Sequence, residues 1–470
     1  MAKLDAKTAY PELDSMEIAR HLGGMVTYKT MVNKEYAGID WSQFEGFQKY
    51  LRETYPLTHE KLELTMIGGY TMLFRWQGSG KSGKKPVLFM AHQDVVPVTP
   101  GTEGDWEHDP FGGEIIDGFV WGRGSTDCKS TLCLTLEAVE YLLKKGFVPD
   151  RDIYLEFGHD EEVGGEMGAG AAARYCEENG IQFDAVFDEG PGFNHGEGID
   201  VGETLLYTVN TFEKGYLDLE IAVNSKGGHS SKPEEHTALG DLARAIVKVE
   251  DRKFPADIPL CVQQYLEAAG PYIQDEELRT LCADVVGNKE KIMEIMMRTP
   301  TGCAMMRTTT AATMAAGSPA PNVLPQRATA IVNFRLNPSE TVESVVEYVR
   351  EAIGDDSVEL TVLNGKDPSN MSSIDSEAFA VMKKTVNAFF PEAVVVPLGS
   401  LGGTDSRRFE TVCPHVYRLS PINNAPYKKN GYTSGAHGTN EKAVVESLAP
   451  AAALYIELMK NLCTQEGRAL

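Results

Sequence analysis

The sequence predicts an α/β protein with a mostly parallel central sheet, interrupted by an inserted ferredoxin-like α+β domain. Continuous apolar runs at residues 87–91, 153–157 and 185–187 have the length and composition of buried parallel strands. Residues 217–223 and 330–336 instead alternate apolar and polar side chains, as half-buried antiparallel strands do. We therefore expect two different sheets within one chain.

The length and the order of these patterns predict the domain boundaries. A chain of 470 residues is too long for one ordinary hydrophobic core. The pattern changes near residue 207, and the buried α/β pattern resumes after residue 366. We expect an α/β domain in two parts, residues 1–206 and 367–470, with the inserted domain at residues 207–366.

The first α/β part is expected to begin with helices at residues 15–21 and 41–55 and a strand at residues 70–75. A longer helix is predicted at residues 128–145, because apolar side chains recur there at spacings of four, three and four: Leu132, Leu136, Val139 and Leu143. One such stripe is what a helix needs to cover a sheet.

In the insert, a helical stripe follows each alternating strand, at residues 239–249 and 342–353, and a strand at residues 358–362 closes the unit. Strand, helix, strands, helix and strand, in this order, make a ferredoxin-like domain. Helices at residues 376–390 and 442–462 then complete the α/β domain.

The composition excludes some classes of partner. With 44 basic and 68 acidic residues the formal net charge is −24, so we expect neither nucleic acid nor an anionic membrane as a partner. The N-terminus lacks the apolar core of a signal peptide. The eight cysteines show no Cys-x-x-Cys spacing and are interpreted as reduced thiols. A cytoplasmic location is the expectation.

Polar side chains follow each of the three predicted parallel strands. His92 and Asp94 follow the first strand, residues 160–162 (Asp-Glu-Glu) the second, and residues 188–189 (Asp-Glu) the third. Asp127 begins the long helix, where an N-cap is its ordinary interpretation. Carboxyl ends of parallel strands lie at one edge of a sheet, so these groups would repel one another without a cation among them. One divalent metal ion, or two, is the simplest remedy.

Two further polar segments lie in the second half of the chain. Residues 402–407 begin with Gly402, Gly403 and Thr404, and residues 435–438 place His437 between small residues. A histidine in such a loop has few neighbours to pack against, which favours a functional role. The next two residues, Asn440 and Glu441, are interpreted as caps of the last helix.

Together and in this order, these segments resemble the co-catalytic zinc peptidases that include aminoacylase-1, bacterial glutamate carboxypeptidase, the Lactobacillus dipeptidase and yeast carboxypeptidase S. The resemblance covers nearly the whole chain. The motifs look most like the carboxypeptidase S branch, which also contains N-acyl amino-acid hydrolases. The segments that carry it are residues 92–94, 122–129, 160–165, 188, 227–231, 322, 335, 402–404 and 435–438.

The resemblance implies a zinc-peptidase-like catalytic domain whose insert serves as a lid and a dimerisation domain. It implies two Zn²⁺ per chain, for which Co²⁺ or Mn²⁺ could substitute. His92 and Asp188 would hold one ion, and Glu162 and His437 the other. Asp127 would bridge both ions. Each ion would then have three protein ligands and one open position, which is the catalytic pattern.

The resemblance also implies catalytic roles for three residues. Glu161 would be the general base, and Asp94 would orient His92. His229 looks like the lid histidine that stabilises the oxyanion, in relatives from across a dimer. A turn residue beside two glycines is the simpler interpretation of His229. Cys128 departs from the pattern, because relatives carry Asp or an apolar residue after the bridging Asp, where the family has a cis peptide.

A substrate carboxylate is implied by a further set of residues. Asn322 and Arg335 look like a clamp for a free carboxylate, since Arg can donate two parallel hydrogen bonds to it. An ordinary surface arginine is the alternative interpretation of Arg335. Backbone donors would come from Gly402, Gly403 and Thr404.

The function that the resemblance implies is hydrolysis of an amide bond beside a free carboxylate, in dipeptides or at the C-terminus of peptides. The alternative is deacylation of N-acyl amino acids by the same residues. A catalytically degenerate metal-binding protein is a third hypothesis, which would require loss of Glu161 or of a ligand. The expected partners are a small peptide or N-acyl amino-acid substrate and a second copy of the chain, bound through the insert.

Overall fold

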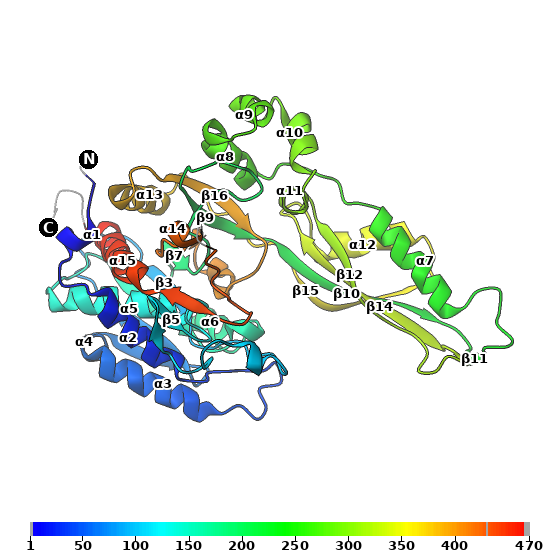
Figure 1. Cartoon of the computed structure of the whole chain (residues 1–470), viewed down its shortest axis with the longest axis horizontal. Helices are drawn as coiled ribbons and strands as arrows, with labels where there is room; N and C mark the ends of the chain where they lie inside the picture. The colour runs from blue at the N-terminus through cyan, green and yellow to red at the C-terminus, as the bar shows by residue number, and fades with distance from the viewer. Residues whose placement is uncertain (1–2, 429–430, 465–470) are drawn as a thin grey trace.

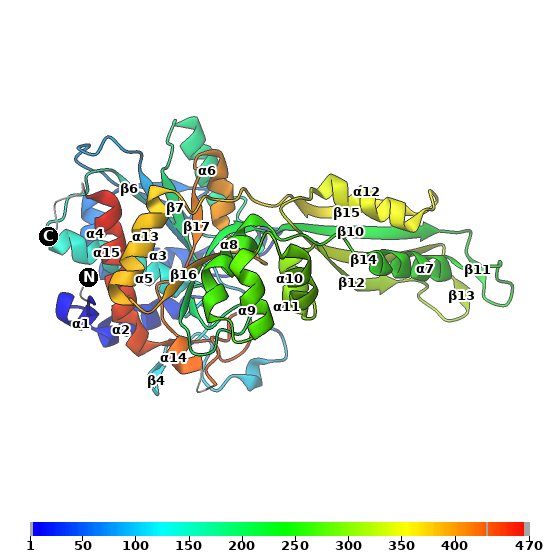
Figure 2. The same ribbon diagram turned by 90° about the horizontal axis from the view of Figure 1, so that it is seen from above.

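The computed structural model describes residues 3–428 and 431–464. The chain forms a large α/β domain, which is the predicted catalytic domain, and an elongated insert that projects from one side of it (Figures 1 and 2). Within the described residues, no helix has both the length and the hydropathy that crossing a membrane requires.

The catalytic domain is built on one large mixed sheet. Its parallel pairs are β3 with β6, β3 with β7, β7 with β17 and β9 with β16. The short strand β8 (Phe193–Asn194) pairs with β9. In spatial order the other strands are β1 (Glu63–Ile67), β2 (Thr71–Trp76), β6 (Ile153–Gly158), β3 (Val87–His92), β7 (Ala185–Asp188), β17 (Val416–Arg418), β9 (Leu206–Glu213) and β16 (Val394–Ser400).

Strand β3 is buried along its whole length because helices cover both faces of the sheet. Val87 and Phe89 belong to a core shared with helices α5 (Lys129–Lys144) and α15 (Leu448–Cys463). Leu88 and Met90 point to the opposite face, where they share a core with α6 (Ala169–Glu178). The predicted apolar run at residues 87–91 is therefore a central strand, as expected for a parallel sheet.

The remaining helices of the catalytic domain pack around this frame. Asp14 and Asp40 accept hydrogen bonds from backbone N–H groups at the starts of α2 and α3. The predicted helix at 442–462 begins only at Leu448, because residues 442–444 form β18, which pairs with β5. The other bounds are α1 (Ala6–Ala9), α2 (Ser15–Val26), α3 (Trp41–Thr54), α4 (Pro56–Lys61), α13 (Glu377–Phe389), α14 (Ala425–Lys428), β4 (Ile115–Ile116), β5 (Phe119–Trp121) and β18 (Lys442–Val444).

The insert contains the predicted ferredoxin-like unit. Four antiparallel strands lie in the order β12-β14-β10-β15, and one face of this sheet shares a core with two helices. Strand β12 was missed by the sequence analysis, because its residues are mostly small and all but the first two are exposed. The bounds are β10 (Gly215–Asn224), α7 (Ala238–Asp251), β12 (Thr309–Ala316), β14 (Arg327–Leu336), α12 (Val342–Ile353) and β15 (Glu359–Lys366).

The boundaries of the insert differ from the predicted 207–366. Strand β9 pairs with β16 in the large sheet, so the catalytic domain extends through Glu213. Helix α8 (Leu260–Ala269) packs against β16, and its core includes residues of β9. Within 207–366, the segment that carries α8 to α11 therefore packs on the catalytic domain. The bounds of the others are α9 (Glu276–Leu281), α10 (Lys289–Met296) and α11 (Pro300–Met306).

A buried acidic pair lies beneath the C-terminal edge of the large sheet. Glu156 on β6 is fully buried, and neither of its carboxylate oxygens has a hydrogen-bond partner among the described residues. Asp405 is 6% exposed, and its Oδ2 also lacks such a partner. Burial, reinforced by the nearby Asp405, raises the pKa of Glu156 well above its ordinary value.

Replacing Glu156 with Gln is expected to stabilise the protein at pH 7 by about 1–3 kcal/mol. An acid whose pKa is raised by folding destabilises the folded state as pH rises above its unfolded pKa, about 4.3. The stability gain should therefore shrink as pH approaches 4. Denaturant unfolding of both proteins at pH 4.5 and pH 7 measures this. A variant no more stable than the parent at pH 7 would contradict the prediction.

Candidate metal centre

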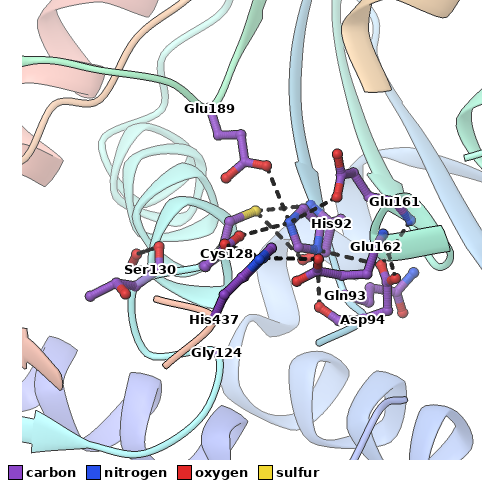
Figure 3. A network of polar contacts seen from close by, with 12 residues as sticks. His92, Gln93, Asp94, Gly124, Cys128, Ser130, Glu161, Glu162, Glu189 and His437 are labelled. Carbon is purple, nitrogen blue, oxygen red and sulfur yellow. Dashed lines mark hydrogen bonds and ion pairs between the residues drawn. The ribbon is translucent and has the colours of Figure 1, made fainter. Parts of the chain in front are cut away.

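The C-terminal edge of the large sheet gathers side chains from four separate segments (Figure 3). His92 is the last residue of β3, and Glu189 directly follows β7. Glu161 and Glu162 begin the 3-10 turn η2 (Glu161–Val163) after β6. Asp127 precedes α5 by two residues. This is the edge where the sequence placed a metal site.

Asp127 lies between two histidines. Its Oδ1 is 3.2 Å from His92 Nε2, and its Oδ2 is 3.1 Å from His437 Nε2. His437 Nε2 is also 3.1 Å from Glu162 Oε2, and His92 Nε2 is 3.2 Å from Glu189 Oε1. One carboxylate thus offers an oxygen to each of two donor sets, which is the arrangement expected of a bridging ligand.

The predicted ligand Asp188 and its neighbour Glu189 make different contacts. The two carboxylate oxygens of Asp188 accept hydrogen bonds from the backbone N–H groups of Glu189 (2.8 Å) and Ser406 (3.0 Å). The neighbouring Glu189 instead directs its carboxylate at His92, as Figure 3 shows. The geometry therefore favours Glu189 over Asp188 as the third metal ligand, beside His92 and Asp127. The sequence shows two adjacent acids after this strand, and the pattern of the strand does not indicate which of the two carboxylates points toward His92.

Asp94 supports both the ligand and the base. His92 Nδ1 lies 2.9 Å from the backbone carbonyl oxygen of Asp94, which accepts its hydrogen bond, and 3.4 Å from Asp94 Oδ1. The two carboxylate oxygens of Asp94 also accept the backbone N–H groups of Glu161 (3.1 Å) and Glu162 (3.0 Å). Asp94 is fully buried, so these bonds are shielded from water. Asp94 therefore holds the histidine through its backbone carbonyl, and its carboxylate holds the turn that carries the two glutamates.

Glu161 has the position and the environment of a general base. Its Oε2 lies 4.0 Å from His92 Nε2, at the edge of the donor sets. Burial raises the pKa of Glu161 well above its ordinary value, an effect that His92 partly offsets. A carboxylate with a raised pKa accepts a proton from water more readily than an exposed one.

The donor set suits two divalent cations. Burial raises the pKa of Glu162 to about 7, and its Oε1 has no hydrogen-bond partner among the described residues. The hydrogen bond to Asp127 raises the pKa of His437 to about 9. Imidazole and carboxylate groups crowded in this way are ligands that Zn²⁺ accepts. The residues present therefore fit the implied group.

Glu441 anchors the loop that carries Asp127. It is fully buried and accepts backbone N–H groups from residues 124, 126 and 127, at 3.0, 2.8 and 3.1 Å. Its Oε2 also pairs with Arg123 Nη1 at 2.7 Å. The sequence analysis interpreted Glu441 as a helix cap, which was wrong: the residue precedes β18 and acts across the domain, 314 residues from Asp127.

Cys128 lies directly behind the centre. The Asp127–Cys128 peptide is cis, as in the family that the sequence resembles. The thiol is fully buried and accepts the backbone N–H of His92 at 3.2 Å. Its sulfur also lies within 4.8 Å of ligand atoms of His92 and Glu189. The side chain is thus packed against the ligands and is not exposed at the surface.

A cavity of about 270 Å³ opens beside Glu161, between the catalytic domain and the insert. Arg335 lines it, as expected, and donates to the Leu401 carbonyl at 3.2 Å. The predicted backbone donors behave differently. The N–H of Gly402 donates to Ser400 Oγ and that of Thr404 to Glu213 Oε1. Of the three predicted donors only the N–H of Gly403 is left without a partner among the described residues.

His229 and Asn322 lie apart from the metal centre of their own chain. His229 is in β11 (Gly228–His229), at the end of the insert farthest from the catalytic domain (Figure 1). The Asn322 carbonyl accepts the Ser230 N–H at 3.1 Å, so the two predicted residues lie close together. His229 is exposed, with Nδ1 2.8 Å from Ser231 Oγ. A single chain in this conformation does not bring them to Glu161.

The chain has relatives of two kinds. It is 32% identical to the "Probable carboxypeptidase S-like 2" of Dictyostelium discoideum, over 96% of this chain and 86% of that protein. It is 34% identical to the "N-fatty-acyl-amino acid synthase/hydrolase PM20D1" of Xenopus tropicalis, over 97% of this chain and 87% of that protein.

Solved structures share the fold. The crystal structure of the M20 family metallo-carboxypeptidase Sso-CP2 from Sulfolobus solfataricus matches with a TM-score of 0.70 and 22% identity, over 94% of this chain and 98% of that chain. Human carnosine dipeptidase 1 matches with a TM-score of 0.65 and 16% identity, over 97% and 98%. The model of peptidase family M20/M25/M40 matches residues 88–461. The chain belongs to this family of metal-dependent hydrolases.

Proposed function

We propose that the protein hydrolyses an amide bond next to a free carboxylate, in dipeptides or at the C-terminus of peptides, with two Zn²⁺ per chain. The observation that carries the proposal is Asp127 between two histidines, each with a glutamate beside it and Glu161 nearby. When bound, two divalent cations would lower the pKa of a shared water and polarise the scissile carbonyl.

The residues of the chain supply the remaining steps. Glu161 accepts the proton of the attacking water and returns it to the leaving nitrogen, so that the amine departs neutral. Asp94 holds the turn that carries Glu161 through its carboxylate and the ring of His92 through its backbone carbonyl. Arg335 faces the same cavity as Glu161, where a free carboxylate on the leaving side can be bound.

A second candidate function is deacylation of N-acyl amino acids. It uses the same residues, and the relative from Xenopus tropicalis, named as an N-fatty-acyl-amino acid synthase/hydrolase, favours it. The two candidates differ only in the acyl part that is released. A degenerate metal-binding protein is disfavoured, because Glu161 and both donor sets are present.

The test is a substrate panel with zinc-loaded and chelator-treated protein. Glycyl-leucine, N-acetyl-leucine and N-palmitoyl-leucine are each compared with their C-terminal amides. We expect turnover of at least one free acid, dependent on metal and at least tenfold slower for its amide, because Arg335 would lose its partner. Metal-independent turnover, or none in the panel, would contradict the proposal.

We further propose a homodimer formed through the insert, in which His229 and Asn322 of one chain complete the metal centre of the other. Two observations support it. Strand β11, which contains His229, lies at the end of the insert farthest from the catalytic domain in Figure 1. The insert also exposes large apolar side chains: Leu239 at 47%, Met314 at 64%, Val323 at 43%, Val362 at 45% and Leu363 at 51%.

Complementation between two inactive variants tests the dimer. Co-expression of Glu161→Gln and His229→Ala chains should restore about a quarter of the parent activity, because half of the dimers mix the chains and each mixed dimer has one intact centre. Co-expression of Glu161→Gln with Asp127→Ala is the matched control and should restore none, since both changes affect one chain's own centre. A fully active monomer in sedimentation would contradict the dimer.

We also propose a cytoplasmic location, which the cysteines support. All eight are free thiols and seven are buried, as in proteins from reducing compartments. Immunofluorescence of the native protein checks the proposal, and a secreted or vesicular pool would contradict it.

A further inference from the structure

The cavity beside Glu161 is rich in basic side chains, although the chain carries a formal net charge of −24. Three acids line it, and two of them, Glu161 and Glu162, belong to the metal centre. The third is Asp405, whose pKa burial raises well above its ordinary value. The cations that line the cavity are Lys34, Lys214, Arg335, Lys366, Arg407 and Arg408.

Within the part of the chain that the structure describes, most of these cations form no ion pair with a carboxylate. Arg408 pairs with Glu166 at 2.9 Å, whereas Arg407 is 3.7 Å from Glu213. Lys214 donates to two backbone carbonyls, at 2.7 and 2.8 Å. The basic groups are therefore not explained as counter-ions of the acids in the protein.

Lys366 is a partly buried cation of this cavity, whereas Lys34 is exposed. Lys366 lies at the end of β15 and forms no hydrogen bond or ion pair with any described residue. A Cβ added to Gly164, which follows the turn of Glu161 and Glu162, would lie 3.7 Å from its Nζ. An ammonium group held this close to the metal centre without a partner is a binding group for an anion.

Arg335 marks the second anion position in the same cavity. Its guanidinium lies over the ring of Tyr216, 4.7 Å from the ring centre, and among the described residues it donates a hydrogen bond only to the Leu401 carbonyl. A guanidinium has five N–H donors, so a carboxylate can still be bound there. Arg335 and Lys366 come from strands that both pair with β10, at opposite sides of Tyr216 in the register.

We propose that this cavity binds an acidic leaving residue, with Arg335 on its α-carboxylate and Lys366 on its side-chain carboxylate. The inference rests on the proposed function and adds a preference for substrates that end in glutamate or aspartate. The volume of about 270 Å³ suits one amino-acid residue, being below the about 300–1,000 Å³ of sites for drug-sized ligands. A fatty acyl chain bound here would cover charged ammonium groups with apolar surface, which is unfavourable. The acyl chain of an N-acyl substrate must therefore lie outside this cavity.

Matched acid and amide substrates test the preference. Glycyl-glutamate is compared with glycyl-glutamine, and N-acetyl-glutamate with N-acetyl-glutamine, since each pair differs in charge and hardly in shape. The parent protein should show at least about tenfold higher kcat/KM on the acidic member of the pair it uses. Equal values within a pair would overturn the proposal.

Variants at Lys366 separate recognition from folding. Lys366→Met should raise KM for the acidic substrate about tenfold and leave kcat/KM for its amide partner within about twofold. Lys366→Glu should instead favour glycyl-lysine over glycyl-glutamate. The control is Lys49→Met, which removes one positive charge at an exposed position of helix α3. It should leave kcat and KM unchanged on both substrates. Equal losses on acid and amide in Lys366→Met would overturn the proposal.

A binding measurement distinguishes this inference from the proposed function. Calorimetric titration of L-glutamate and L-glutamine into zinc-loaded protein reports the site without turnover. Tighter binding of L-glutamate that is lost in Lys366→Met would support the anion site, even if no substrate in the panel were hydrolysed and the proposed function failed. Equal binding of the two amino acids would overturn the anion site, even if hydrolysis were observed.

Discussion

Replacing Glu161 with Gln is expected to lower kcat by about 10²–10⁴, because the amide cannot take the proton of the attacking water. Zinc content should remain near that of the parent. Glu161 Oε2 is 4.0 Å from His92 Nε2, and Glu161 belongs to neither of the two groups of closely spaced ligand atoms around His92. Steady-state kinetics and elemental analysis of the same preparation measure the two quantities together.

The control is Glu178→Gln, which makes the same chemical change at the exposed last residue of α6. It should leave kcat unchanged. If Glu161→Gln retained the parent rate, another group would have to be the base. If it lost zinc together with activity, Glu161 would be a ligand, and the division of roles between Glu161 and Glu162 would be wrong.

Replacing Glu189 with Gln is expected to weaken binding of one of the two metal ions by at least about 10²-fold. Loss of a residue that only hydrogen-bonds to a metal ligand lowers metal affinity about 10–100-fold, and loss of a ligand itself should cost more. Asp188→Asn should keep both ions, since the carboxylate of Asp188 is engaged by backbone N–H groups. Competition with a chromogenic chelator gives the stoichiometry and the affinity of both variants.

These two variants differ by one position in the chain and make the same change from acid to amide, so each is the control for the other. The opposite result, with zinc lost in Asp188→Asn and retained in Glu189→Gln, would restore Asp188 as the ligand. Equal loss in both variants would indicate a local structural role for the pair and would contradict the assignment of Glu189.

The general plan of the site followed from local patterns. An apolar run that ends in His92, and a second that ends before Glu161, must bring those side chains to one edge if the strands are parallel and adjacent. The register of β3 with β6 and β7 confirms that arrangement. A crowd of acids at such an edge requires a cation, whatever the fold around it.

Other parts of the site depend on contacts that no local pattern contains. Glu441 reaches the loop of Asp127 from a distant position in the chain, so a cap was the only role that its neighbours in sequence suggested. Thr404 looked like a substrate donor, but its N–H is taken by Glu213. A single lysine after a glycine, such as Lys366, forms no motif in the sequence, and its proposed role follows only from its position in the cavity.

The sequence alone determined the two-sheet architecture, the edge that carries the metal centre, and the family resemblance, because strand and helix periodicity and the residues at strand ends are local properties. Only the tertiary structure distinguished the contacts of Asp188 from those of Glu189, assigned residues 206–213 and the helices α8 to α11 to the catalytic domain, and placed β11, which contains His229, at the far end of the insert. The physical reason is that side-chain direction at the end of a strand, and the packing of distant segments, are set by contacts between residues far apart in the chain.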